Sequence, residues 1–191
     1  MKILVTGANG YIGRYVVKAL LDNGAEVIAC DIVCNEVDDR AECRSLNLFE
    51  LPEGNVWEQL GSPDVCLHMA WRNGFVHNAP TQMGDVSAHY NFMTAMIDGG
   101  LKQLAVMGTM HEVGYWDGAI DENTPCNPIS MYGIAKDALR RAMIQYTAQN
   151  GCILQWLRAY YILGDDRKNN SIFCKLLNAA DEGKKTFPFT T

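Results

Sequence analysis

Short apolar runs alternate along this chain with longer segments in which apolar residues recur at helical spacing. Continuous apolar runs are typical of buried parallel strands, whereas a period of about 3.6 residues indicates a helix with one buried face. The predicted strands are 3–5, 26–31, 44–48, 64–70, 103–107 and 152–157. The predicted helices follow Gly13 as far as Asn23-Gly24 and cover 52–60, 79–98, 130–149 and 171–182. This alternation predicts an α/β fold with a doubly wound parallel sheet.

Glycines gather at the first junction between a strand and a helix, in Thr6-Gly7-Ala8-Asn9-Gly10-Tyr11-Ile12-Gly13. Glycines there permit a tight turn and let phosphates approach the helix amides, whose dipole attracts anions. Because ordinary turns also contain glycines, the motif is informative only together with residues further along the chain. It is a candidate dinucleotide site in a Rossmann-type sheet. The predicted cofactor contacts in this turn are Gly7, Asn9, Gly10, Tyr11, Ile12 and Gly13.

An acidic residue, Asp31, ends the second predicted strand. A carboxylate at this point can accept hydrogen bonds from both hydroxyls of an adenosine ribose, and its charge repels a 2′-phosphate. A solvated acid at a strand end is the alternative interpretation, and the upstream glycines favour the cofactor role. We therefore expect NAD, rather than NADP, as the cofactor.

Composition and charge exclude several classes of protein. With 191 residues, 48% of them hydrophobic and 20% charged, the chain is typical of one soluble globular domain or a domain with the beginning of another. The net charge of −6 argues against a nucleic-acid partner or an anionic membrane surface. There is no pattern of a signal peptide and no apolar run long enough to span a bilayer, so we expect a cytoplasmic protein.

The seven cysteines are scattered and form no Cys-x-x-Cys pair, and no histidine stands at metal-ligand spacing from them. Most are expected to be small apolar core residues in a reducing compartment. We therefore predict no metal site.

The predicted helix 130–149 carries Tyr132 and Lys136, which are four residues apart and so share one face. A free tyrosine has a pKa of about 10, and a nearby ammonium or an oxidised nicotinamide favours its phenolate. The pair is a candidate general acid and base that removes a hydroxyl proton as hydride leaves the same carbon. An exposed helix pair is the alternative, because this spacing is common by chance.

The ordered set of motifs resembles the extended short-chain dehydrogenase/reductase family, the NAD-dependent nucleotide-sugar epimerases and dehydratases. The matching stretches are the glycine turn, Asp31, His68-Met69-Ala70, Thr109 and Tyr132-Gly-Ile-Ala-Lys136. The run from Glu122 to Tyr132, together with Leu157-Arg158 and Gly164, matches the family as well.

The resemblance implies roles for further residues. Thr109 would hold the substrate oxygen beside Tyr132, and Lys136 would complete the catalytic set. The implied cofactor contacts are Asn47 and Leu48 near the adenine, and Met69, Ala70, Trp71, Tyr132 and Lys136 along the dinucleotide. Asn47 stands where many members have Asp. The resemblance also implies a homodimer that packs through the helices 79–98 and 130–149.

The residues after Thr109 bear on the reaction. Family 4,6-dehydratases carry an acid pair directly after this threonine, whereas this chain has Met110-His111 and only then Glu112. Dehydration is thus disfavoured, and we expect a 4-epimerase that removes and returns hydride on a nucleotide sugar through a 4-keto intermediate. A 4-keto-sugar reductase or dehydratase of the same family remains an alternative. So does a non-catalytic dinucleotide-binding or redox-sensing module.

Candidate substrate contacts are His111, whose alternative is a surface histidine, and Tyr161, which stands where many members have a substrate-contacting Asn. Because members of the family are longer, we expect 1–165 to be the NAD-binding domain. Residues 166–191 would begin a substrate-binding part that is largely absent from this chain.

Overall fold

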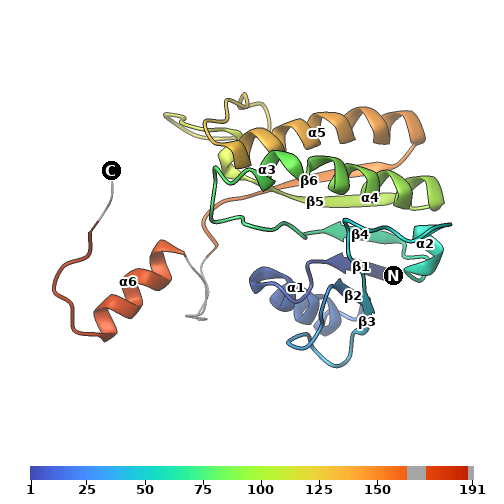
Figure 1. Ribbon diagram of the computed structural model, residues 1–191, viewed down its shortest axis with the longest axis horizontal. Coiled ribbons are helices and arrows are strands. Elements are labelled where there is room, and N and C mark those ends of the chain that lie inside the picture. Colours follow the sequence, from blue (N-terminus) through green and yellow to red (C-terminus); the bar gives the residue numbers. More distant parts are fainter. Residues whose placement is uncertain (163–170, 189–191) are drawn as a thin grey trace. The chain divides into compact units, whose positions relative to one another are not determined.

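A six-stranded parallel sheet forms the centre of Met1–Ala159, the larger of the two compact units into which the chain divides. The computed structural model describes residues 1–162 and 171–188. The strands are β1 (Lys2–Thr6), β2 (Glu26–Asp31), β3 (Glu42–Ser45), β4 (Val65–His68), β5 (Gln103–Thr109) and β6 (Ile153–Ala159). They lie in the order β3-β2-β1-β4-β5-β6 (Figure 1).

The chain reverses its direction of travel across the sheet at β1. This strand pairs with β2 on one side, where Val5 lies opposite Ala29, and with β4 on the other, where Val5 lies opposite Leu67. In a doubly wound sheet, ligands bind beyond the carboxyl ends of the strands at such a switch point. The topology therefore places a crevice after Thr6, Asp31 and His68.

Helices cover both faces of the sheet (Figure 1). Helix α1 (Tyr11–Asp22) lies on one face, where a core cluster includes Val5, Val17 and Ala29. On the other face lie α4 (Val86–Gly99) and α5 (Met131–Asn150), with Phe92 and Leu139 in a second cluster. The shorter elements are α2 (Val56–Gln59), α3 (Thr81–Gly84) and the 3₁₀ turn η1 (Met110–Glu112). The predicted doubly wound α/β fold is confirmed.

Two predicted elements differ in extent. The predicted helix 79–98 is interrupted between Gly84 and Val86, where Asp85 ends α3 and precedes α4. The predicted strand 44–48 is instead Glu42–Ser45, because the chain turns after Leu46, whose amide still donates to Asp31 O. The predicted helix 52–60 forms only at Val56–Gln59. The other boundaries shift by a few residues at most.

The second unit, Tyr160–Thr191, contains α6 (Ile172–Asp181), whose N-cap Ser171 accepts a hydrogen bond from the amide of Cys174. Gly164, part of the family resemblance, lies outside the described residues. The proposed division at 165 stays a prediction. Within the described ranges, no helix is both long and apolar enough to cross a membrane.

Candidate functional site

The glycine turn between β1 and α1 is closed by backbone packing. A Cβ on Gly7, which has φ +69°, would come within 2.7 Å of Ala70 N on the neighbouring β4 loop. A Cβ on Gly13 would come within 2.1 Å of Gly7 O. Gly10 caps α1 without a side chain, which leaves the first helix amides available to an anion. The turn is thus a cradle that any larger residue would fill.

Asp31 is oriented by the same turn. Its Oδ2 accepts from the amide of Asn9 at 3.0 Å, and its Oδ1 accepts from the amide of Ile32 at 2.8 Å. The Asn9 side chain donates to Asn35 Oδ1 at 3.0 Å and accepts from the Glu36 amide at 2.8 Å. Asn9, a predicted cofactor contact, therefore uses its side chain to tie the loop after β2 to the glycine turn.

A cavity of about 240 Å³ opens at this switch point. Its lining contains eight of the predicted cofactor residues, namely Gly7, Gly10, Asp31, Asn47, Leu48, Met69, Ala70 and Trp71. The predicted contacts Asn9, Tyr11, Ile12, Gly13, Tyr132 and Lys136 are not among its lining residues. The lining adds Phe49, Arg72 and His89, which sequence reasoning missed. Phe49 and Arg72 directly follow predicted contacts, whereas His89 lies on α4 and belongs to no motif.

Two buried histidines, His68 and His89, lie behind the cavity, and of the two His89 lines it. Thr6 Oγ1 lies 2.8 Å from His68 Nδ1, and His68 Nε2 lies 2.9 Å from His89 Nδ1. Because Thr6 Oγ1 also accepts from the amides of Met69 and Ala70, its own proton is free to go to His68. Burial lowers the pKa of His68 well below its usual value and that of His89 to about 3. The two rings are therefore neutral, and they hold the backbone that lines the cavity.

The predicted catalytic residues meet at the ends of β5 and α5. Burial raises the pKa of Tyr132, and the neighbouring side chain of Thr109 opposes the rise. Lys136 is 2% exposed, and its Nζ donates to Met107 O at 2.8 Å and lies 4.0 Å from the centre of the Trp71 ring. Burial lowers the pKa of Lys136 to about 7. The alternative of an exposed helix pair is thus wrong.

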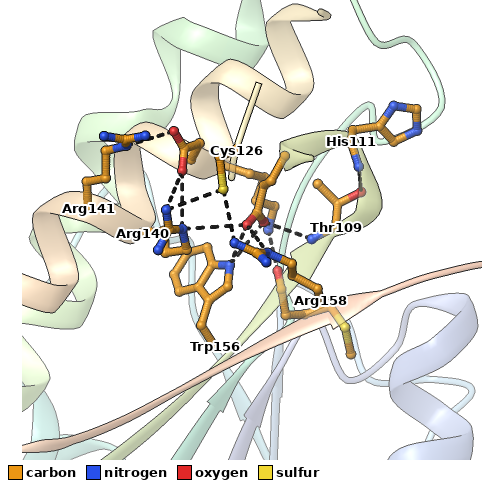
Figure 2. Close-up of polar contacts among 11 residues, drawn as sticks. Thr109, His111, Cys126, Arg140, Arg141, Trp156 and Arg158 are labelled. Carbon is orange, nitrogen blue, oxygen red and sulfur yellow. Dashed lines mark hydrogen bonds and ion pairs between the residues drawn. The ribbon is translucent and has the colours of Figure 1, made fainter. Parts of the chain in front are cut away.

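A buried carboxylate, Glu112, holds Thr109 in place. Its partners Thr109, Trp156 and Arg158 are labelled in Figure 2. The carboxylate accepts from the amide of Thr109 at 2.8 Å, from Trp156 Nε1 at 3.0 Å and from Arg158 Nε at 3.2 Å. The amide of His111 donates to Thr109 Oγ1 at 3.3 Å. In Figure 2 the His111 side chain lies away from Arg140, Arg141 and Arg158. The carboxylate of Glu112 is therefore engaged in contacts within the protein.

The remaining predicted site residue, Tyr161, belongs to the second unit. It is exposed, and its ring packs edge-on against Phe173 with centroids 5.8 Å apart. Its role as a substrate contact stays a prediction. In the described part of the chain, no group of three or more histidine, cysteine or acidic side chains could hold a metal ion.

Comparison with known proteins identifies the family. The model of the NAD dependent epimerase/dehydratase family matches residues 3–191. The chain belongs to this family. The family consists of NAD-dependent enzymes, so the predicted family, enzyme class and cofactor are confirmed. The chemistry of the cavity suits NAD, because it combines a glycine turn at a helix start with the carboxylate of Asp31. The roles of individual residues stay predictions.

A relative from Aggregatibacter actinomycetemcomitans, dTDP-6-deoxy-L-talose 4-dehydrogenase (NAD(+)), is 47% identical over 196 residues, which cover 100% of this chain and 72% of the relative. UDP-glucose 4-epimerase from Thermotoga maritima, solved with UDP-glucose, matches 100% of this chain and 66% of its own, with a TM-score of 0.83 and 21% identity. MoeE5, solved with UDP-glucose and NAD, matches 96% of this chain and 62% of its own, with a TM-score of 0.79 and 26% identity. The chain thus spans less than two thirds of both solved proteins.

Proposed function

We propose that the protein transfers a hydride between NAD and C4 of a nucleotide-linked 6-deoxy-hexose, in the manner of a sugar 4-dehydrogenase. The observation that carries this proposal is the meeting of the Thr109 side chain with Tyr132, one helical turn before buried Lys136. This arrangement suits removal of a hydroxyl proton next to a hydride acceptor. The 47% identity to a dTDP-6-deoxy-L-talose 4-dehydrogenase supports the choice of sugar class.

The predicted cofactor contacts would hold NAD along the crevice. The amides of the glycine turn would bind the pyrophosphate, and Asp31 would accept from the adenosine ribose. Asn47 and Leu48 line the cavity on the side of β3, and Trp71 lines it beside Lys136. NAD supplies the acceptor or donor of the hydride. In this orientation, the reactive end of the cofactor would lie toward Tyr132.

Tyr132 would take the hydroxyl proton of the substrate while Thr109 holds the same oxygen. Burial raises the pKa of Tyr132, so a phenolate at neutral pH needs compensation. The side chain of Thr109, which lowers the pKa of Tyr132, supplies part of it. A cation supplies the rest, either as the ammonium of Lys136 or as the charge of an oxidised nicotinamide.

Glu112 supports a dehydrogenase or epimerase over a dehydratase. A dehydratase needs a free acid and base close to the threonine. In this chain the Glu112 carboxylate is fully buried and binds Thr109, Trp156 and Arg158. It cannot reach a substrate without breaking these contacts. The adjacent Met110 and His111 supply no carboxylate.

A 4-epimerase is the second candidate, because Thr109, Tyr132, Lys136 and tightly held NAD suffice for removal and return of hydride. The two reactions differ in what leaves the protein. A dehydrogenase releases NADH and a keto sugar, whereas an epimerase inverts one sugar centre with no net change in NAD. A non-catalytic dinucleotide-binding module would do neither.

The test is to incubate the protein, and any longer natural form whose reading frame continues past Thr191, with NAD and a panel of dTDP- and UDP-hexoses. We expect NADH formation with a dTDP-6-deoxy-hexose. Tyr132→Phe should lower the rate by about 10²-fold or more while NAD still binds. Inversion of C4 without NADH would select the epimerase. Bound NAD with no reaction across the panel, in every form tested, would refute both enzymatic proposals.

We also propose that the protein forms a homodimer through α4 and α5 and acts in the cytoplasm. On α5, Met131, Ile134 and Ile144 are at least partly exposed apolar side chains that a partner helix could cover. Sedimentation equilibrium tests the dimer: Ile144→Lys should give a monomer with unchanged secondary structure. A wild-type protein that sediments as a monomer at high concentration would contradict it.

A further inference from the structure

Two histidine rings lie against the ring of Tyr132, and the reaction proposed above uses neither. The His77 ring is nearly parallel to that of Tyr132, at 12° and with centroids 5.7 Å apart. The His111 ring lies 5.6 Å from Tyr132 and 4.1 Å from His77. The three rings therefore form one cluster, and we call His77 and His111 the histidine pair.

Backbone contacts from three segments hold this cluster together. The amide of Tyr132, at the start of α5, donates to His77 O at 2.8 Å. The amide of His111 donates to Thr109 Oγ1 at 3.3 Å. A Cβ on Gly133 would come within 2.2 Å of His111 O, so the close approach of η1 to α5 requires glycine there. The pair is thus placed by the same contacts that place Tyr132 and Thr109.

The chemistry of the pair suits a proton path. Imidazole is the side chain whose unperturbed pKa lies closest to neutral pH. Both histidines are half-buried, so they border the site and also face water. Lys136 is different, because it is 2% exposed and its Nζ is held by Met107 O. Of these groups near Tyr132, the pair is the better placed to exchange protons with solvent.

We propose that the histidine pair carries the proton of Tyr132 to and from solvent during hydride transfer. The inference rests on the proposed function. In oxidation, the C4–H bond breaks and its electron pair leaves as hydride to NAD, while the hydroxyl proton passes to the Tyr132 phenolate and the C4–O double bond forms. Tyr132 then gives its proton to a neutral imidazole of the pair, and the imidazolium releases it to water. One alcohol and one oxidised NAD thus yield one ketone, one NADH and one proton.

The proposal fixes the direction of the pH dependence. Oxidation needs a neutral imidazole, so its rate falls as the pH drops through the pKa of His111. Reduction needs the imidazolium, so its rate rises over the same range. Burial lowers the pKa of His111, and the charge of His77 lowers it further. The other titratable groups described around the cluster are Tyr132 and Lys136 of α5, and Glu112 of η1, which acts on Tyr132.

The first experiment compares the double variant His77→Gln/His111→Gln with Asn78→Ala. Asn78 Oδ1 accepts from the amide of Met131 at 3.1 Å, so its loss loosens the same loop but keeps both imidazoles. In the double variant, NADH formation should fall about tenfold or more and lose its imidazole-dependent step in the pH profile. Added imidazole should restore the rate, and the NAD Kd should stay within about twofold. Asn78→Ala should keep the pH profile of the wild type.

A double variant with the wild-type rate and pH profile would overturn the proposal. So would a parallel loss of rate and NAD affinity that imidazole does not restore, because that pattern indicates a purely structural role. A second measurement needs no turnover. In an NMR titration of the ring protons, His77→Gln should raise the pKa of His111, because a neighbouring cation is removed. If no sugar is oxidised, the proposed function fails. Independently of turnover, an unchanged pKa of His111 in His77→Gln would overturn the proposed role of the histidine pair.

Discussion

A lysine buried without a carboxylate partner destabilises a protein, and the energetics of Lys136 reflect this. Its Nζ has one hydrogen bond, to Met107 O, and a cation–π contact with Trp71. Neither contact replaces full hydration, and burial lowers its pKa to about 7. The cost of burying this ammonium should be visible as a pH-dependent stability.

Lys136→Met should therefore stabilise the fold while abolishing the reaction. Because the folded pKa lies below the unfolded one, the folded state binds fewer protons between them, and wild-type stability rises with pH from about 7 to about 10.5. The advantage of the variant is thus largest below about pH 7 and shrinks above it. Denaturant unfolding at several pH values measures this, with exposed Lys102→Met as the control. A variant that is less stable than the wild type at low pH would contradict it.

Gly13 presents the opposite case, in which an added methyl group has no room. A Cβ there would lie 2.1 Å from Gly7 O and 2.8 Å from Ala8 O, and both are backbone atoms. Gly13→Ala should destabilise the protein by about 1–3 kcal/mol and weaken NAD binding by displacing the start of α1. Gly74→Ala is the control, since nothing lies within 4 Å of its added Cβ. Unfolding curves and calorimetric titration with NAD decide it, and an unchanged NAD Kd in Gly13→Ala would speak against the cradle.

At the scale of elements, Glu112 joins four pieces of structure. It lies in η1, binds the end of β5 through the Thr109 amide and binds β6 through Trp156 and Arg158. Arg140 of α5 lies 3.8 Å from the same carboxylate. Thr109, the proposed catalytic threonine, is thus positioned by a buried ion network, in which removal of one partner leaves the others uncompensated.

Glu112→Ala should therefore destabilise the protein by about 3–5 kcal/mol. It should also lower the rate of hydride transfer at saturating NAD, because Thr109 loses its anchor. Exposed Glu122→Ala is the matched control and should change neither quantity by much. Thermal unfolding and steady-state kinetics measure the two effects. A Glu112→Ala protein with wild-type stability would show that the network contributes little.

The elements that sequence reasoning placed best are those with long apolar periods or runs, such as α1, α5 and the inner strands. The predicted bounds of edge strand β3 were wrong because all four of its residues are exposed and carry no hydrophobic signal. The division of 79–98 was missed because a break at Asp85 depends on a tertiary contact, its ion pair with Arg72. Local pattern predicts elements, and packing decides where they end.

At the scale of the whole molecule, the switch point after β1 explains why so much of the candidate site could be predicted. Asp31 ends β2, the glycine turn and Met69-Ala70 come directly after β1 and β4, and parallel strands bring their carboxyl ends to one edge. His77 and His89 escaped prediction because each reaches its place through contacts between segments that share no motif. The chain of contacts from Thr6 through His68 to His89 forms only once α4 is packed on the sheet.

Trp71 gives the cofactor cavity an optical property. Its indole lines the cavity, stacks on His89 with centroids 4.4 Å apart and donates from Nε1 to Gln82 Oε1 at 2.7 Å. Of the four tryptophans, all of which lie in the described ranges, it alone lines this cavity, so bound NADH should quench its emission and fluoresce by energy transfer. Trp71→Phe should remove most of this transfer, whereas Trp116→Phe should preserve it, as emission spectra during NADH titration would record. The emission spectrum of the protein would then report whether its bound cofactor is oxidised or reduced.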